Sequence, residues 1–147
     1  MSSLIIMSCS KTKKPLEQVR AIDLYDGKAF RIIKKHSPGD LEILIISAKY
    51  GIIHSKDIIS YYDQVMTVSK AIELRDEVEK ETRRITKCNH TEKVFLYLGH
   101  PYNLSISKEL LSYLDECVNL QIASGTIGKR LHQLKEWLES IKEVSKW

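Results

Sequence analysis

Residues 4–8 read Leu-Ile-Ile-Met-Ser, and this almost wholly apolar run decides the fold class because similar runs recur along the chain. Two more follow at 41–47 (LEILIIS) and 94–98 (VFLYL). Short runs without polar alternation are typical of strands covered on both faces, as in parallel sheets. A fourth run at 118–123 (VNLQIA) alternates apolar with polar residues, which predicts an edge strand.

The segments between these runs carry apolar residues at helical spacing. Helices are predicted over residues 27–36, 69–87, about 101–114, and 128 to about 146. This order predicts one α/β domain over residues 1–147, with a mostly parallel sheet of four or five strands and helices on both faces. Residues 52–68 break the alternation and are interpreted as a functional loop or an extra short strand at 57–61.

Composition narrows the class of protein. A length of 147 residues with 43% hydrophobic content suits a single core, and the net charge of +4 fits a phosphate-bearing partner without identifying one. No run approaches the roughly 20 apolar residues of a membrane span, so we expect a cytoplasmic protein that does not enter a membrane. Three widely separated cysteines argue against a disulfide framework.

A polar cluster follows each predicted strand. In open α/β sheets, ligands bind in the loops beyond the carboxyl ends of the strands, so the four clusters are expected to meet at one rim. The clusters are residues 8–15 (SCSKTKKP), 47–51 (SAKYG), 97–102 (YLGHPY) and 124–130 (SGTIGKR).

The last cluster has two interpretations. Gly125 and Gly128 allow backbone amides to approach a ligand, Thr126 offers a hydroxyl, and Lys129 and Arg130 add positive charge at the start of a helix. This pattern indicates an anion cradle. The alternative is a glycine turn with ordinary N-capping by Ser124 or Thr126, since the spacing matches neither a P-loop nor a dinucleotide fingerprint.

The first cluster places Cys9 directly after a buried strand and close to several lysines. Neighbouring positive charge lowers a thiol pKa, which makes Cys9 a candidate nucleophile with Ser8, Ser10, Lys11 and Lys13 as ligand contacts. The alternative is a small apolar residue that closes the strand. A phosphatase-type reaction is excluded because no arginine stands six positions after the cysteine.

The second cluster supplies Lys49 and Tyr50 at the end of a central strand. Lys49 is interpreted as a partner for a phosphate or for Asp63, with a solvated lysine at a strand end as the alternative. Asp63 is the candidate general base, and Tyr61 or Tyr62 is a candidate for stacking on a base or for plain loop packing.

The third cluster contains His100 next to Gly99. Because imidazole titrates near neutral pH, His100 is a candidate for donating to a substrate carbonyl, with capping of the next helix as the alternative. The other histidines show no metal-ligand spacing, so no metal site is predicted, and no cofactor is identified.

Taken together, these blocks resemble a YaaA-like domain family of unknown function. The matching segments are residues 6–13 (IMSCSKTK), 46–53 (ISAKYGII) and 59–63 (ISYYD), supported by 23–25 (DLY) with Phe30 and by the glycine-containing turn and helix start at 125–135.

More distantly, the order of blocks is similar to that of YaaA peroxide-stress proteins and of the core of archaeosine synthase. The first resemblance implies DNA binding, and the second implies modification of a deazaguanine base in transfer RNA. Ser8 and Leu16 depart from the second pattern, which has proline and tyrosine there. The resemblance implies that one pocket is surrounded by Cys9, Lys11, Lys49 and Asp63.

The leading hypothesis is an enzyme that handles a nucleobase or nucleotide, free or within a nucleic acid. Its alternative is a non-catalytic nucleic-acid-binding module of the stress-response type, in which the same lysines contact phosphates. An accessory subunit that uses the charged helix at 69–87 is a third possibility. The oligomeric state is not predicted.

Overall fold

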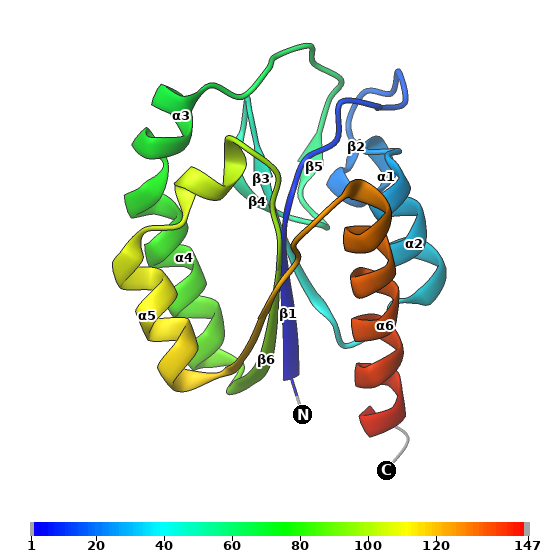
Figure 1. Cartoon of the computed structure of the whole chain (residues 1–147). Coiled ribbons are helices and arrows are strands. Elements are labelled where there is room, and N and C mark those ends of the chain that lie inside the picture. Colours follow the sequence, from blue (N-terminus) through cyan, green and yellow to red (C-terminus); the bar gives the residue numbers. More distant parts are fainter. Residues whose placement is uncertain (1, 146–147) are drawn as a thin grey trace.

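The computed structural model describes residues 2–145, with side chains described to residue 142. A central sheet lies between two groups of helices (Figure 1). The strands are β1 (Ser2–Ser8), β2 (Val19–Arg20), β3 (Glu42–Ser47), β4 (Gly51–His54), β5 (Ile58–Ile59), β6 (Thr91–Tyr97) and β7 (Asn119–Ile122). The helices are α1 (Ala21–Leu24), α2 (Lys28–His36), α3 (Val68–Glu73), α4 (Arg75–Cys88), the 3-10 turn η1 (Tyr102–Ser105), α5 (Lys108–Cys117) and α6 (Ile127–Ser145).

The main sheet has five strands in the order β4-β3-β1-β6-β7. Strand β1 pairs in parallel with both β3 and β6, so that Ile6 lies beside Leu44 on one side and Leu96 on the other. Strand β7 is parallel to β6 at one edge, and β4 is antiparallel to β3 at the other. The predicted mostly parallel sheet, with the polar fourth run at an edge, is confirmed.

Helices cover both faces of this sheet, as predicted. On one face α2 contacts α6, which also contacts β6; on the other, α4 contacts β4 and β6 (Figure 1). The predicted terminal helix is present as α6, and Lys146, which was included in that prediction, lies outside the described residues. Among the described residues, no helix is long and apolar enough to cross a membrane.

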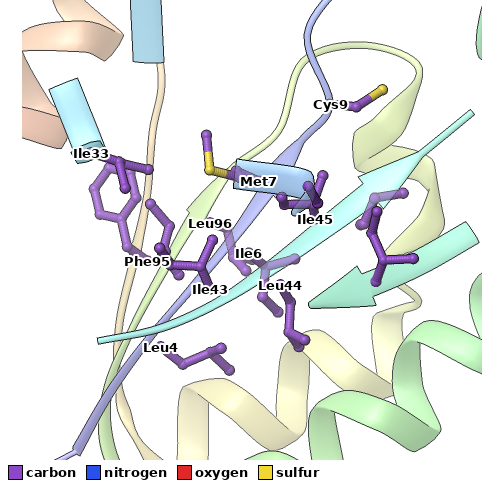
Figure 2. Close-up of a cluster of buried hydrophobic side chains, with 14 of the residues drawn as sticks. Leu4, Ile6, Met7, Cys9, Ile33, Ile43, Leu44, Ile45, Phe95 and Leu96 are labelled. Atoms are coloured by element: carbon purple, nitrogen blue, oxygen red, sulfur yellow. The ribbon is translucent and has the colours of Figure 1, made fainter. Parts of the chain in front are cut away.

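The core consists of the apolar strand residues and the helix faces against them. Leu4, Ile6, Leu44 and Ile45 are fully buried at the centre, and Figure 2 shows the cluster with Cys9 at the far end of β1. Complete burial of one such side chain stabilises the fold by about 1.5–3 kcal/mol. The continuous apolar runs are therefore explained by coverage on both faces.

The segment after β3 differs from the prediction. Gly51 adopts a φ of +75°, which side-chain-bearing residues rarely adopt, and the chain reverses there to form β4 against β3. The predicted extra strand is present as β5, but it pairs with β2 in a separate two-stranded sheet. Residues 60–67 then form the loop that carries Asp63 over the sheet end.

Two predicted helices are interrupted. The segment 69–87 forms α3 and α4, which are separated at the buried Leu74. The segment 101–114 forms η1 and then α5, whose start is capped by Ser107 Oγ accepting from the Leu110 N–H at 3.1 Å. Apolar spacing continues across both interruptions, and this spacing alone did not reveal them.

Candidate functional site

Cys9 ends the central strand and opens onto the rim. Its N–H donates to the Ile46 carbonyl at 3.0 Å, which extends the β1–β3 pairing by one residue. The side chain is 9% exposed, and its Sγ lies 3.1 Å from the Tyr102 hydroxyl. The cysteine is therefore held by backbone pairing from β3 and by a phenol from η1.

A cavity of about 250 Å³, called the first cavity here, borders Cys9. Three separate loops form its wall: the loop after β1, the loop after β5 and the loop after β6. Its lining residues are Cys9, Ser10, Lys11, Lys13, Asp63, Gln64, Val65, Met66, His100, Pro101 and Tyr102. Four predicted groups, Cys9, Lys11, Asp63 and His100, thus share one cavity although they lie up to 91 residues apart in the sequence.

A network of buried hydroxyl groups lies beneath this end of the sheet. The Tyr62 hydroxyl is 2.8 Å from the Tyr25 hydroxyl and 2.9 Å from Ser47 Oγ. Ser47 Oγ also accepts from the N–H groups of Lys49 and Tyr50, at 3.2 and 3.0 Å. This network ties the end of β3 to α1 and to the loop after β5.

Burial raises the pKa of the phenols in this region. It raises the pKa of Tyr25 to about 12 and also raises the pKa of Tyr62, with the neighbouring Cys9 as a further cause. The pKa of Tyr102 is raised by burial first and then by its hydrogen bond to Cys9. At neutral pH these groups are hydrogen-bond donors, and Tyr102 is placed to donate to sulfur.

The predicted residue Tyr62 belongs to this network. Its side chain is 6% exposed, its ring makes an edge contact with Tyr50 at 5.4 Å, and Lys13 Nζ lies 4.5 Å from the ring centroid. The buried ring leaves little surface for stacking on a base. Tyr61, which is 45% exposed, retains an open face.

Lys49 follows β3 at the same end of the sheet as Cys9 but lies outside the first cavity. Its exposed ammonium is 5.2 Å from the Tyr50 ring. The Tyr50 hydroxyl donates to the Ser60 carbonyl at 3.2 Å and so fastens the loop that leads to Asp63. The structure brings Asp63 to the cavity and leaves Lys49 and Tyr50 beside it.

A second cavity, of about 340 Å³, borders Cys9 from the side of α2 and α6. It shares Cys9 and Ser10 with the first cavity. Its lining residues are Ser8, Cys9, Ser10, Gly27, Lys28, Ala29, Phe30, Tyr97, Ile127 and Leu131. The predicted contact Ser10 therefore forms, with Cys9, a wall between two spaces, and the predicted contact Ser8 borders the second cavity.

Ser10 is held in that wall by the start of α2. Its Oγ accepts from the Gly27 N–H at 3.2 Å and donates to the Thr12 carbonyl. A Cβ added to Gly27 would meet Ser10 Cβ at 2.8 Å, closer than real contacts allow. Glycine is required at position 27 because the backbone passes so close to Ser10.

The predicted anion cradle at 124–130 is largely occupied by contacts within the protein. Thr126 Oγ1 accepts from the Lys129 N–H at 3.3 Å, as an ordinary N-cap does. Arg130 donates to the Leu98 carbonyl at 2.6 Å and lies 5.3 Å from the Tyr97 ring. Gly125, with a φ of +96°, shapes the turn, and Gly128 is exposed.

Arg130 keeps one polar atom without a partner. Its Nε is buried, and the N–H there has no hydrogen-bond acceptor among the described residues. The predicted residue Gly99 lies beside the same guanidinium, because a Cβ added to Gly99 would be 3.9 Å from a terminal nitrogen of Arg130. These contacts fasten the loop after β6, which carries His100 to the first cavity.

Tyr25 and Tyr102 were missed as site residues. Each lies in a segment that was singled out from the sequence. Tyr25 belongs to the block 23–25, and Tyr102 ends the third polar cluster. A tyrosine in the same polar clusters as the candidate nucleophile could have been predicted as its partner. Only the fold shows which of the seven tyrosines reaches Cys9. Among the described residues, no group of three potential metal ligands gathers.

Comparison with protein-family models assigns the chain to a family. A family model described as a family of unknown function (DUF6884) matches residues 4–136. The chain belongs to this family. No curated protein and no solved structure matches it, so the similarity to YaaA proteins and to archaeosine synthase has no support from these comparisons.

Proposed function

We propose that the protein is an enzyme that acts on a nucleobase or nucleotide, free or within a nucleic acid, with Cys9 as the reacting group. The observation that carries this proposal is the Cys9 thiol, 3.1 Å from a neutral phenol, on the wall of a cavity that also contains two lysines.

The chemistry follows from the groups around the thiol. Cys9 Sγ forms a bond to an electrophilic ring carbon while the π electrons of the C=N or C=O bond move to the heteroatom. The thiol proton passes to a base on the cavity wall, for which Asp63 and His100 are the candidates. Tyr102 and the lysines stabilise the negative charge that develops on sulfur or on the ligand.

The size of the first cavity limits the ligand. Pockets for drug-sized molecules measure roughly 300–1,000 Å³, and this cavity is slightly smaller at about 250 Å³. It suits one base or one phosphate group with part of a sugar. A larger nucleic acid would insert a single nucleotide end and leave the remainder outside.

The test is calorimetric titration with AMP, GMP, CMP, UMP and a short single-stranded oligonucleotide as probes. The variant Lys11→Ala/Lys13→Ala should weaken binding of the best probe about tenfold or more, because hydrogen bonds to charged groups contribute about 1.5–3 kcal/mol. The control Lys80→Ala/Lys87→Ala removes the same charge from exposed positions on α4 and should change binding less than twofold.

Cys9→Ser separates binding from chemistry. This variant should bind the best probe as tightly as the parent and form no covalent adduct or product, as followed by intact mass spectrometry. Two outcomes contradict the proposal: no probe binds below about 1 mM, or the two lysine variants bind alike.

A non-catalytic nucleic-acid-binding module is the second candidate, favoured by exposed groups at the rim. Lys11, Lys14 and Lys49 are exposed, and Tyr61 has an open ring face. This candidate predicts oligonucleotide binding that falls steeply with salt and is unchanged in Cys9→Ser, with no turnover of any probe.

A further inference from the structure

The two cavities that meet at Cys9 differ in charge. The first is bordered by Lys11, Lys13, Asp63 and His100. Among the described residues that line the second, Lys28 is the single lysine, arginine or acidic residue. The second cavity therefore carries fewer charged side chains than the first.

The walls of the second cavity are mainly aromatic and aliphatic. The ring of Phe30 is almost completely buried, and Tyr97 and Leu131 are partly buried beside it. Ile127 stands at the wall with 70% of its surface exposed, which is unusual for isoleucine. A flat ring inserted here would contact Tyr97 and Leu131 and cover part of Ile127.

A few polar groups converge on the same space, as in small-molecule sites. Helix α2 begins there with Gly27 as its N-cap, and no side chain caps it. The first N–H groups of a helix have no acceptor within the helix, so those of Lys28 and Ala29 are donors for a ligand. The Ser8 hydroxyl adds a group that donates or accepts, whereas the Ser10 hydroxyl already donates to the Thr12 carbonyl.

We infer that the second cavity is a separate subsite for a flat heteroaromatic ring of nucleobase size. Ring nitrogens or carbonyl oxygens accept from the start of α2 and from the Ser8 hydroxyl, and the ring packs against the partly buried Tyr97 and Leu131. The ring reaches Cys9 from the opposite side to the charged groups of the first cavity. This inference rests on the proposed function for the role of Cys9.

The volume agrees with such a ligand. At about 340 Å³ the second cavity lies at the lower end of the range for small-molecule pockets. Its shared wall with the first cavity is formed by Cys9 and Ser10, and Ser10 is fixed by Gly27. Occupation of the second cavity should therefore change the accessibility of the thiol.

The experiment uses the full chain with Cys88→Ser/Cys117→Ser, because these two cysteines are exposed and would also react. Adenine and guanine at millimolar concentration are the ring probes, and inorganic phosphate is the anion probe. Alkylation of Cys9 by iodoacetamide is followed by intact mass, and ring binding is followed by saturation-transfer NMR. We expect a ring probe to slow alkylation at least fivefold.

Filling variants assign the binding site. Leu131→Trp and Ile127→Trp occupy the second cavity and should each weaken ring binding at least fivefold; Ile127→Trp lies at the exposed mouth and keeps the test valid if Leu131→Trp unfolds. Val65→Trp occupies the first cavity, and Leu111→Trp is a control at an exposed position on α5. Neither of these should change ring binding more than twofold.

The outcomes separate this inference from the proposed function. Ring binding that is lost in Val65→Trp and kept in both second-cavity variants overturns the inference and leaves the proposed function intact. The inference is also overturned if phosphate slows the alkylation of Cys9 and this protection is lost in the second-cavity variants. The second cavity would then bind anions. Nucleotide binding that is unchanged in Lys11→Ala/Lys13→Ala contradicts the proposed function without affecting the ring subsite.

Discussion

The loop after β1 and the turn before α6 have similarly polar sequences, yet the fold uses them differently. The first contributes Cys9, Ser10, Lys11 and Lys13 to the wall of a cavity. In the second, residues 124–130, Thr126 caps a helix and Arg130 binds the Leu98 carbonyl.

The difference teaches how to interpret polar clusters. A cluster becomes a candidate site where other loops surround it and leave its side chains facing a shared space. It becomes structural where most of its polar side chains already have partners in the protein. Four measurements test this contrast.

Tyr62→Phe should have the largest effect, because it removes a hydroxyl that contacts both Tyr25 and Ser47. Leaving buried polar groups unpaired costs about 1–3 kcal/mol, and we expect a loss of about 2 kcal/mol in the free energy of unfolding, measured in urea. The control Tyr61→Phe, at an exposed position, should stay within about 0.5 kcal/mol of the parent. Equal losses in the two variants would remove the network as a support of the site.

Tyr102→Phe should slow alkylation of Cys9 at pH 7.5 about tenfold in the Cys88→Ser/Cys117→Ser background. The reason is loss of the donor 3.1 Å from sulfur, since a hydrogen bond to a charged group contributes about 1.5–3 kcal/mol. Tyr113→Phe is the control, because that hydroxyl contacts Thr86 at 2.9 Å. An unchanged rate in Tyr102→Phe would show that the phenol does not assist the thiol.

Alkaline pH should destabilise the network. Tyr25 has its pKa raised to about 12 by burial, whereas a tyrosine in the unfolded chain titrates near the ordinary value of about 10. The contribution of neutral Tyr25 to stability is fully present below pH 10 and is lost as the pH rises through 12. The free energy of unfolding should fall by about 1 kcal/mol between pH 9 and pH 11. Unfolding in urea at these two pH values measures the loss, and Tyr25→Phe should reduce it.

Thr126→Ala should have the smallest effect. Loss of this N-cap costs about 1 kcal/mol of stability at most sites, with values down to about 0.5. The rate of Cys9 alkylation should remain unchanged, because the turn serves α6 and not the first cavity. A change of more than threefold in that rate would place the turn in the site after all.

Much of the fold followed from the sequence because burial on both faces leaves a direct pattern. The runs at 4–8, 41–47 and 94–98 became the three central strands, and the polar fourth run became the edge. Strand β4 was missed because its hydrophobic residues follow Gly51 directly, and nothing local distinguishes a reversal from a loop. The interruption at Leu74 was missed since apolar spacing continues through it.

The site was predicted in part. Cys9, Lys11, Asp63 and His100 were named from their positions after strands, and they line one cavity. Tyr102 was not named as a site residue, because a tyrosine in a polar cluster carries no sign of the thiol that it will reach. Similarly, Ser10 was named without Gly27, whose close approach depends on how α2 packs.

The sequence by itself determined that apolar segments would pair as a covered sheet and that polar loops would follow their carboxyl ends. Hydrophobic burial and strand direction require this wherever such runs alternate with helices. Only the tertiary structure decided which side chains meet: which phenol contacts the thiol, which glycine supports Ser10, and which basic residue is held inside the protein. These contacts join residues far apart in the chain, and their geometry depends on packing that no local pattern records.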